Sequence, residues 1–258
     1  MKKFLAIITS ALLLVGATMG LTACNDKEKL YVYTNAGFAP YEYVNEYGEV
    51  VGIDIDVMQE IGEILGYEVV INDIEFDNIL NEVSKNKMAV GAAGMSKKEA
   101  RDAVALASDI YATSQQYVIA PDNTFDANAT VTVDQILAKV GTLKVGVQKG
   151  TTGADLVLGE DEVNADKVIE YSNAIVASED IGTTLGAVVI DQLPAETISG
   201  NKNGLSCWKI DAEMESYVLY FNKEATELVK KVNNILAIMK TNGVIDYLTI
   251  KHSGGIVG

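Results

Sequence analysis

The sequence predicts an α/β fold, because short β-branched or aromatic runs alternate along the chain with longer segments of helical period. The chain has 258 residues, which is enough for one large domain or for two lobes of roughly a hundred residues each. It has only two cysteines, Cys24 and Cys207, so a small disulfide-rich scaffold is excluded. A hydrophobic core must therefore carry the stability of the fold.

The N-terminus has the order of a secretory signal. Lys2 and Lys3 precede an apolar run at 4–15, which is too short to span a bilayer comfortably, and then a small-residue stretch at 16–23. Leu-Thr-Ala-Cys at 21–24 resembles the bacterial lipobox, which implies cleavage before Cys24 and a lipid on its thiol. We therefore expect residues 1–23 to be a signal peptide of the lipoprotein type; an ordinary signal peptide with an incidental cysteine is the alternative. The remaining cysteine, at position 207, is then expected to be a buried apolar residue.

The mature chain is strongly acidic. Removal of residues 1–23 leaves 235 residues and takes away two lysines, so the formal net charge goes from −16 to −18. Such a surface is repelled by nucleic-acid phosphates and gains nothing from an anionic lipid surface. Nucleic acid is therefore not expected as a partner. The charge leaves the ligand open, because a pocket can differ in sign from the surface around it.

Turn residues and hydrophobic period place the elements in order. In the first half we expect a strand at 30–34, a hairpin at 41–51 turning at Tyr47-Gly48, a helix at 54–65 ended by Gly66, a strand at 69–74, a helical segment at 77–86, a buried strand at 89–93 and a short helix at 97–101. In the second half we expect a strand at 117–120 stopped by Pro121, a surface loop at 122–130, a helix at 133–138, a strand at 143–147, a helix at 152–158, a strand at 187–190 and helices at 226–241 and 243–248.

Catalytic and metal sites are predicted to be absent. The only histidine, His252, is the seventh residue from the sequence end, so a histidine-based triad or a zinc site with two histidines is not expected. No nucleophile elbow, phosphate-binding loop or dinucleotide fingerprint occurs. Carboxylates are too widely scattered to single out an acid and base pair. We therefore predict no cofactor and no metal.

Several sequence blocks occur in an order that points to one family. They are Thr34-Asn35-Ala36-Gly37-Phe38-Ala39-Pro40-Tyr41-Glu42-Tyr43, Gly52-Ile53-Asp54-Ile55-Asp56, Phe76-Asp77, Ala92-Ala93-Gly94-Met95-Ser96 with Arg101, Ser108-Asp109-Ile110-Tyr111, Val145-Gly146-Val147-Gln148-Lys149-Gly150-Thr151-Thr152-Gly153 and Ala187-Val188-Val189-Ile190-Asp191. Together they resemble the extracytoplasmic solute-binding proteins of polar amino acid ABC importers, bacterial solute-binding protein family 3, over nearly the whole mature chain.

The resemblance implies the periplasmic-binding-protein type 2 fold, with two α/β lobes joined by crossover strands that we place near 112–118 and 215–221. Such a protein, expected to be an extracytoplasmic monomer, closes its lobes around a free amino acid and delivers it to an ABC permease in the membrane. The expected bounds are 24–29 for a lipid-anchored linker, 30–115 and 219–258 for lobe I, and 116–218 for lobe II, inserted into lobe I.

The chemistry of a free amino acid explains the expected site residues. Its carboxylate and ammonium both lose water when a cleft closes, so both need new hydrogen bonds and opposite charge. Arg101, the only arginine in the chain, is the expected clamp on the carboxylate, because a guanidinium offers two parallel donors. Ser96 and the backbone near Gly94 would add donors. Thr151 and Thr152, at the start of a helix, would add donors from the other lobe, or would only cap that helix.

Asp191 is the expected partner of the ligand ammonium, because it follows a strand, where ligands collect in open α/β sheets. A turn aspartate is the alternative reading. By the resemblance, Phe38 and Phe76 sandwich the ligand side chain, and Ala93 and Gln148 belong to the same site. Without the resemblance, both aromatic residues would be interpreted as core.

The sequence departs from the family at several positions. Ala89 and Gly186 replace acidic residues that usually precede two buried strands, so we expect altered loop packing there. Asn35 replaces an aspartate found in relatives that bind cationic amino acids, and an amide cannot neutralise a buried cation. We therefore favour a neutral polar ligand such as glutamine, or cystine, over a cationic one. Lys149 would suit an acidic ligand, although a solvated loop lysine is the simpler interpretation.

Two other functions stay open at this point. Some proteins of this fold are enzymes similar to cyclohexadienyl dehydratases, in which Glu42 or Asp191 would act as the general acid. A sensory module that passes its ligand signal to a receptor is the other alternative.

Overall fold

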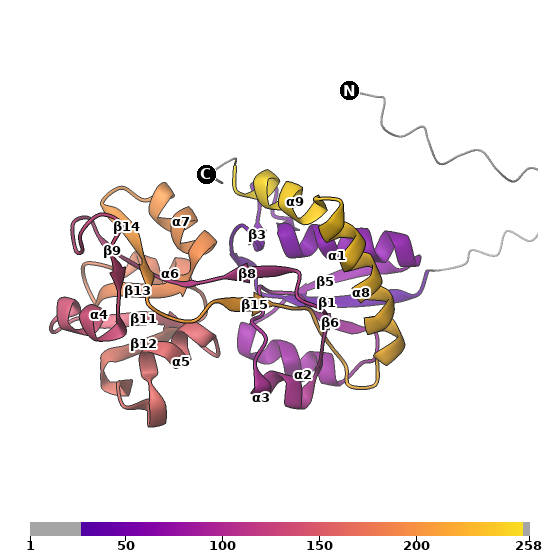
Figure 1. The fold of residues 1–258 in the computed structure, drawn as a ribbon, viewed down its shortest axis with the longest axis horizontal. Coiled ribbons are helices and arrows are strands. Elements are labelled where there is room, and N and C mark those ends of the chain that lie inside the picture. The colour runs from indigo at the N-terminus through magenta and orange to yellow at the C-terminus, as the bar shows by residue number, and fades with distance from the viewer. Residues whose placement is uncertain (1–26, 255–258) are drawn as a thin grey trace, which may run out of the picture.

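The computed structural model describes residues 27–254 and shows two lobes, each a central sheet flanked by helices (Figure 1). The helices are α1 (Ile53–Leu65), α2 (Ile79–Ser84), α3 (Glu99–Val104), α4 (Val133–Val140), α5 (Thr152–Leu158), α6 (Ala174–Glu179), α7 (Gln192–Asn201), α8 (Thr226–Thr241) and α9 (Val244–His252), with short 3-10 turns η1 (Phe76–Asn78), η2 (Glu160–Glu162) and η3 (Ala165–Lys167). In these described residues, no helix is long and apolar enough to cross a membrane. The expected signal peptide and Cys24 lie outside them.

The sheet of lobe I has five strands in the order β5-β1-β6-β16-β7. Its strands are β5 (Glu68–Asp73), β1 (Lys29–Thr34), β6 (Ala89–Gly91), β16 (Tyr220–Phe221) and β7 (Leu106–Ala107). β1 runs parallel to both neighbours, with Val32 opposite Ile71 on one side and Val90 on the other. β16 runs antiparallel to β6 and β7 and reaches this sheet from the far end of the chain.

The sheet of lobe II has six strands in the order β10-β14-β9-β13-β11-β12. Its strands are β10 (Thr130–Val131), β14 (Leu205–Ile210), β9 (Gln116–Pro121), β13 (Leu185–Asp191), β11 (Lys144–Gln148) and β12 (Val168–Tyr171). β13 lies at its centre, antiparallel to β9 and parallel to β11. Helices α4, α5, α6 and α7 pack on β13, so the residue that ends this strand, Asp191, is held from several sides.

Two strands cross between the lobes. β8 (Ala112–Ser114) carries the chain from lobe I to lobe II, and β15 (Glu215–Tyr217) brings it back (Figure 1). They pair antiparallel, with Thr113 opposite Ser216. The two-lobe α/β fold is therefore confirmed. The lobe bounds 30–115, 116–218 and 219–258 stay a prediction.

A short three-stranded sheet carries the first aromatic residue of the site. β2 (Gly37–Phe38), β3 (Glu42–Val44) and β4 (Val50–Val51) form it, and the turn between β3 and β4 is closed by the side chain of Asn45, which accepts hydrogen bonds from Tyr47 and Glu49 amides. Gly52, at φ 143°, then starts α1, and a Cβ there would lie 2.1 Å from the Tyr41 carbonyl oxygen. Only glycine allows this approach.

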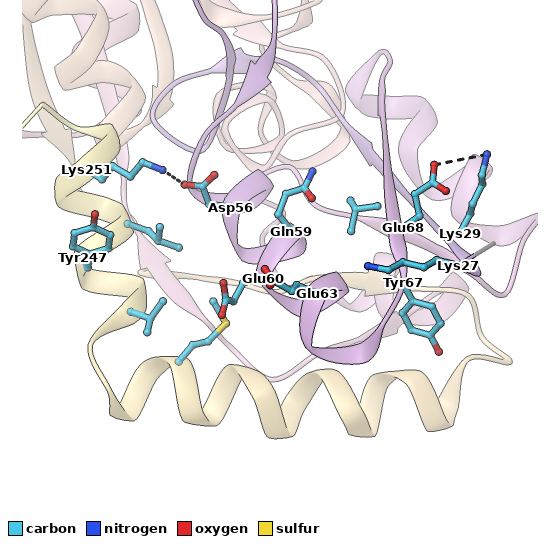
Figure 2. Close-up of a pocket in the computed structure, with 14 residues that line it drawn as sticks. Lys27, Lys29, Asp56, Gln59, Glu60, Glu63, Tyr67, Glu68, Tyr247 and Lys251 are labelled. Carbon is cyan, nitrogen blue, oxygen red and sulfur yellow. Dashed lines mark hydrogen bonds and ion pairs between the residues drawn. The ribbon is translucent and has the colours of Figure 1, made fainter. Parts of the chain in front are cut away.

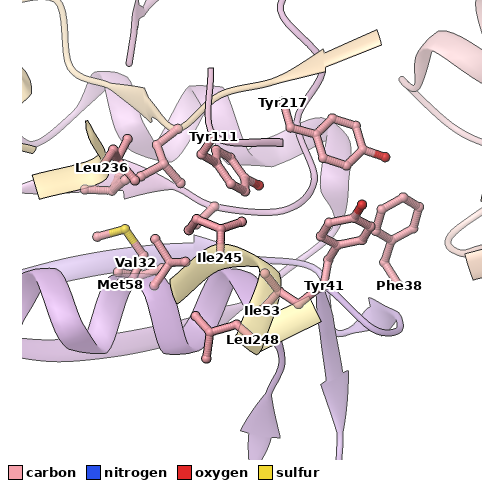
Figure 3. Close-up of a cluster of buried hydrophobic side chains, with 14 of the residues drawn as sticks. Val32, Phe38, Tyr41, Ile53, Met58, Tyr111, Tyr217, Leu236, Ile245 and Leu248 are labelled. Carbon is pink, nitrogen blue, oxygen red and sulfur yellow. The ribbon is translucent and has the colours of Figure 1, made fainter. Parts of the chain in front are cut away.

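The core of lobe I extends into the site. Val32 from the sheet, Ile53 and Met58 from α1 and Leu236 from α8 are fully buried and belong to one cluster (Figure 3). The aromatic rings continue this cluster: the centroids of Tyr41 and Tyr217 are 5.0 Å apart in an edge-on contact, and those of Phe38 and Tyr41 are 5.6 Å apart. The aromatic wall of the site is thereby fixed to a packed core.

The predicted elements are found, with shifted ends in places. The helix expected at 54–65 is α1, and Gly66 ends it at φ 80° with its amide bonded to the Gly62 carbonyl. The segment expected to be helical at 77–86 is the 3-10 turn η1 followed by α2. The helix expected at 97–101 begins two residues later, because Lys98 is still extended and the preceding Ser96 bridges to Tyr217.

Seven helices and strands lack a sequence prediction, as do the turns η2 and η3: β2, β7, β10, β12, α6, α7 and β14. α7 contains Pro194, which local propensity disfavours in a helix, yet this residue lies in the first turn, where no amide donor is needed. Cys207 was expected to be buried and is only half-buried. It lies on β14, which α7 contacts. At Gly186, a Cβ would lie 3.0 Å from the Cα of Val140, so α4 packs where an acidic side chain would stand.

Candidate amino acid site between the lobes

A small cavity of about 20 Å³ lies between the two lobes. All ten residues expected in the ligand site line it: Phe38, Phe76, Ala93, Gly94, Ser96, Arg101, Gln148, Thr151, Thr152 and Asp191. Three further residues complete the lining: Glu42, Gln116 and Ile190. Residues from eight separate elements thus meet at one place, although nothing in their sequence spacing requires it.

Arg101 is buried at the lobe boundary. Its Nη1 donates to the Ser96 carbonyl oxygen at 2.8 Å, and its Nη2 donates to the Gly150 carbonyl oxygen of lobe II at 3.1 Å. The guanidinium carbon lies 5.3 Å from the ring centroid of Phe76, a cation–π contact. Burial lowers the pKa of Arg101, but an arginine remains charged. It is therefore a fixed cation inside the cavity.

The hydroxyls of Ser96 and Thr152 face each other across the lobe boundary, 3.5 Å apart. Both donate to the carboxylate of Glu215, which reaches in from the crossing strand β15; the Thr152 distance is 2.9 Å. Thr151 instead caps α5: its hydroxyl accepts from the Ala154 amide at 3.1 Å and donates to the Gln148 carbonyl oxygen at 2.8 Å. Of the two neighbouring threonines, Thr152 is the one whose hydroxyl faces lobe I.

Asp191 lies at the end of β13 and the start of α7, and its side chain is 6% exposed. It accepts hydrogen bonds from Gln116 Nε2 and from the Tyr217 hydroxyl. Burial, followed by the negative charge of Glu215, raises the pKa of Asp191 to about 8 against the lowering effect of these donors and of Arg101. A cation bound beside Asp191 would bring this pKa down and recover the cost of burial.

Phe38 and Phe76 are both in the lining and nearly buried. Phe38 lies directly over Gly94, since a Cβ at Gly94 would be 2.6 Å from the Phe38 ring. The Gly94 amide donates at 2.8 Å to Asp54, a fully buried residue of α1. The hydrogen bond to Asp54 thus fixes the backbone at Gly94 beside the cavity.

The lobes contact each other around the cavity. Gln148 Nε2 of lobe II donates to Asn35 Oδ1 at 2.9 Å, while Asn35 Nδ2 donates to the Ile74 carbonyl oxygen at 2.8 Å. Lys149 pairs with Asp77 at 2.7 Å across the same boundary. The amide of Asn35 is therefore engaged between the lobes and is not in the cavity lining. Lys149 has a partner within the protein.

The order of these side chains matches a known family. The model of the bacterial extracellular solute-binding proteins, family 3, matches residues 30–255, which include both lobes and every residue of the cavity. The chain belongs to this family.

Relatives of this solute-binding protein include proteins named for amino acids. The arginine-binding extracellular protein ArtP of Bacillus subtilis is 25% identical over 270 residues, covering 97% of this chain and 98% of the relative. Holo ArgBP from T. maritima is 30% identical, with a TM-score of 0.73 over 82% of this chain and 90% of that chain. The substrate-binding protein AbpA of an amino acid ABC transporter from Streptococcus pneumoniae, bound to L-arginine, is 25% identical, with a TM-score of 0.78 over 88% and 95%.

Sequence reasoning missed two polar residues of the predicted crossovers: Gln116, which lines the interlobe cavity, and Glu215, which accepts hydrogen bonds from lining residues. Gln116 starts β9 and Glu215 starts β15, both inside the predicted crossovers, but neither lies in a family block quoted above. Glu42 lies in such a block, yet its side chain had no predicted binding role. A polar residue inside a crossover strand is the signal that would have found the first two.

A second, wider groove lies on the outside of lobe I, between α1 and α9 (Figure 2). Its charges pair with each other, Lys251 with Asp56 and Lys29 with Glu68. All of its lining residues belong to 27–69 or 239–251, so lobe II contributes none of them. Closure of the lobes would not enclose a ligand in this groove, so the interlobe cavity is the candidate site. Among the described residues, no cluster of three or more histidine, cysteine or carboxylate side chains could hold a metal.

Proposed function

We propose that this chain binds a free amino acid between its lobes and delivers it to an ABC permease. One observation carries the proposal: Arg101 of lobe I and Asp191 of lobe II, the cation and the carboxylate that a zwitterion needs, line the same interlobe cavity. Closure of the lobes replaces the water around both ends of the ligand with these groups. Relatives named for arginine and histidine binding agree with this chemistry.

A thermal-shift screen of the mature protein against the twenty amino acids and cystine tests the proposal. A ligand that binds the folded protein raises the unfolding temperature according to its concentration and affinity. Isothermal titration calorimetry then gives the affinity of each stabilising compound. No shift with any amino acid at millimolar concentration would refute amino acid binding.

We propose that Glu42 contacts the side chain of the ligand. The sequence-based preference for glutamine or cystine over a cationic ligand depends on Asn35, whose amide is engaged between the lobes. Glu42 is 1% exposed and lines the cavity, and its Oε2 has no hydrogen-bond partner. Burial raises the pKa of Glu42 well above its usual range. A protonated Glu42 suits a neutral amide, whereas a guanidinium would lower this pKa and pair with the carboxylate. We therefore propose a ligand whose side chain donates hydrogen bonds, with glutamine and arginine as candidates.

Calorimetry on Glu42→Gln separates these candidates. If the ligand is arginine, the variant loses a buried charge partner, and its arginine affinity falls at least tenfold. If the ligand is glutamine, the neutral variant retains most of its affinity. Glu46→Gln, a substitution of an exposed glutamate four residues away, is the matched control and leaves binding unchanged in both cases.

An enzyme similar to cyclohexadienyl dehydratases is the second candidate. The observation that favours it is again Glu42, because a buried carboxyl group with a raised pKa suits a general acid. Incubation of the purified protein with prephenate and with arogenate decides the matter. Turnover that is lost in Glu42→Gln would establish the enzyme, and the absence of turnover with tight amino acid binding would leave the transport function.

The protein works outside the cytoplasm, and we propose that a lipid at Cys24 holds it at the membrane. Cys24→Ser should release the protein from the membrane fraction and abolish incorporation of labelled fatty acid, while Cys207→Ser changes neither. Genome context separates import from the sensory alternative, because permease and ATPase genes beside this gene would favour import. A monomer is expected, and light scattering of the mature protein measures this directly.

A further inference from the structure

Glu215 takes hydrogen bonds that a bound carboxylate would need. It is half-buried in the crossing strand β15, at the hinge between the lobes. Its Oε2 accepts from Ser96 of lobe I and from Thr152 of lobe II, and its Oε1 accepts from Gln116 Nε2 at 3.0 Å. All three donors line the interlobe cavity. One carboxylate of the protein thus collects donors from both lobes.

Glu215 and a ligand carboxylate compete for the same hydrogen-bond donors. A hydroxyl group has a single hydrogen, so Ser96 and Thr152 cannot donate to a ligand while they donate to Glu215. Two of the Arg101 donors are also engaged, with the Ser96 and Gly150 carbonyl oxygens. A ligand carboxylate at this place would also lie beside the negative charge of Glu215, with Asp191 nearby.

We propose that Glu215 is an internal stand-in for the ligand carboxylate. It bridges the hydroxyls of Ser96 and Thr152, holds the lobes together through them, and is displaced when an amino acid enters. The inference rests on the proposed function and adds an autoinhibitory contact to it. Displacement costs free energy, so Glu215 weakens ligand affinity and favours a closed ligand-free protein.

Two variants and one control test the proposal. Glu215→Gln keeps the size of the side chain and removes its charge, Glu215→Ala removes the acceptor, and Glu213→Gln changes an exposed glutamate two residues away. Calorimetry uses the amino acid that stabilises the wild-type protein most. We expect both Glu215 variants to bind it about tenfold more tightly, because a tenfold change in affinity corresponds to the free energy of about one charge-assisted hydrogen bond. The control should bind as wild type.

Small-angle X-ray scattering of the ligand-free proteins gives a second readout. We expect a larger radius of gyration for both Glu215 variants than for wild type and Glu213→Gln, because the bridge between the lobes is lost. Equal radii, or weaker ligand binding in the Glu215 variants, would overturn the proposal; weaker binding would instead make Glu215 a partner of the ligand ammonium. If wild type binds no amino acid, the proposed function fails, and the radii alone decide the bridging role. Thermal unfolding confirms that each variant is folded.

Discussion

Asp54 of α1 accepts a hydrogen bond of 2.8 Å from the backbone amide of Gly94 and a second one of 2.6 Å from the Tyr111 hydroxyl. This fully buried carboxylate connects the first helix of lobe I to the backbone beside the interlobe cavity. Burial raises the pKa of Asp54 to about 6, while the two donors lower it. Asp54 is thus ionised at pH 8 and depends on both donors.

Removal of one donor tests this support. We expect Tyr111→Phe to lower the free energy of unfolding by about 1–3 kcal/mol at pH 8, because a buried charge loses a partner. At pH 5 Asp54 is protonated and the loss is smaller. Urea unfolding at the two pH values measures both, with Tyr247→Phe, at an exposed position, as the control. An equal loss at both pH values would contradict the role of the charge.

Arg101 should be indispensable for binding. We expect Arg101→Ala to weaken amino acid binding by about 2–5 kcal/mol, because the ligand carboxylate loses a desolvated charge partner. Arg101→Lys should recover only part of this, since an ammonium cannot form two parallel bonds. Calorimetry measures both, and Lys97→Ala, which removes an exposed cation nearby, serves as the control. Unchanged affinity in Arg101→Ala would refute its role as the clamp.

Asp191 should make the ligand-free protein less stable as pH rises. Its pKa is about 8 in the folded protein, against about 3.9 in an unfolded chain, so between these values the folded state holds a proton that the unfolded state has released. The free energy of unfolding therefore falls as pH increases from about 4 to about 8 and levels off above. Asp191→Asn should flatten this dependence in urea unfolding measured from pH 5 to 8. A slope equal to that of wild type would rule out the raised pKa.

The same pKa couples binding to proton release. An ammonium placed beside Asp191 stabilises its carboxylate, so binding at pH 6.5 should release about one proton from this residue. Calorimetry in buffers of different ionisation enthalpy counts the protons released. We expect the count to fall at pH 9, where Asp191 is already ionised. Identical counts at the two pH values would show that Asp191 does not receive the ammonium.

Gly94 and Gly48 form a matched pair for backbone and packing effects. Both have positive φ, 53° and 79°, so alanine costs about 1–2 kcal/mol of strain at either position. At Gly94 the added Cβ also meets the Phe38 ring, whereas at Gly48 nothing lies within 4 Å. Gly94→Ala should therefore destabilise more and weaken ligand binding, while Gly48→Ala leaves binding intact. Equal effects on binding would show that Phe38 does not form the cavity wall.

Local signals in the sequence indicate most of the helices and strands, and the family resemblance supplies much of the cavity lining. Gly66 ends α1 where expected, and Arg101 is conspicuous as the only arginine. Glu215 has no such signal: its role depends on the path of β15 between the lobes and on the hydroxyls it reaches there. Asn35 is different, because the sequence shows that it replaces the aspartate of relatives that bind cationic amino acids. Only the fold shows that its side-chain amide bonds to Gln148 across the lobe boundary.

The place of β16 in the first sheet has a consequence for synthesis. Every strand of the second sheet has left the ribosome once residue 210 is clear, whereas the first sheet lacks the strand between β6 and β7 until residue 221 follows. The sheet of the inserted lobe, although later in sequence, is thus complete first. Until β16 is synthesised, β6 of the first sheet has one unpaired edge. Growing chains of this protein should need protection from aggregation on that side until β16 arrives and closes the sheet.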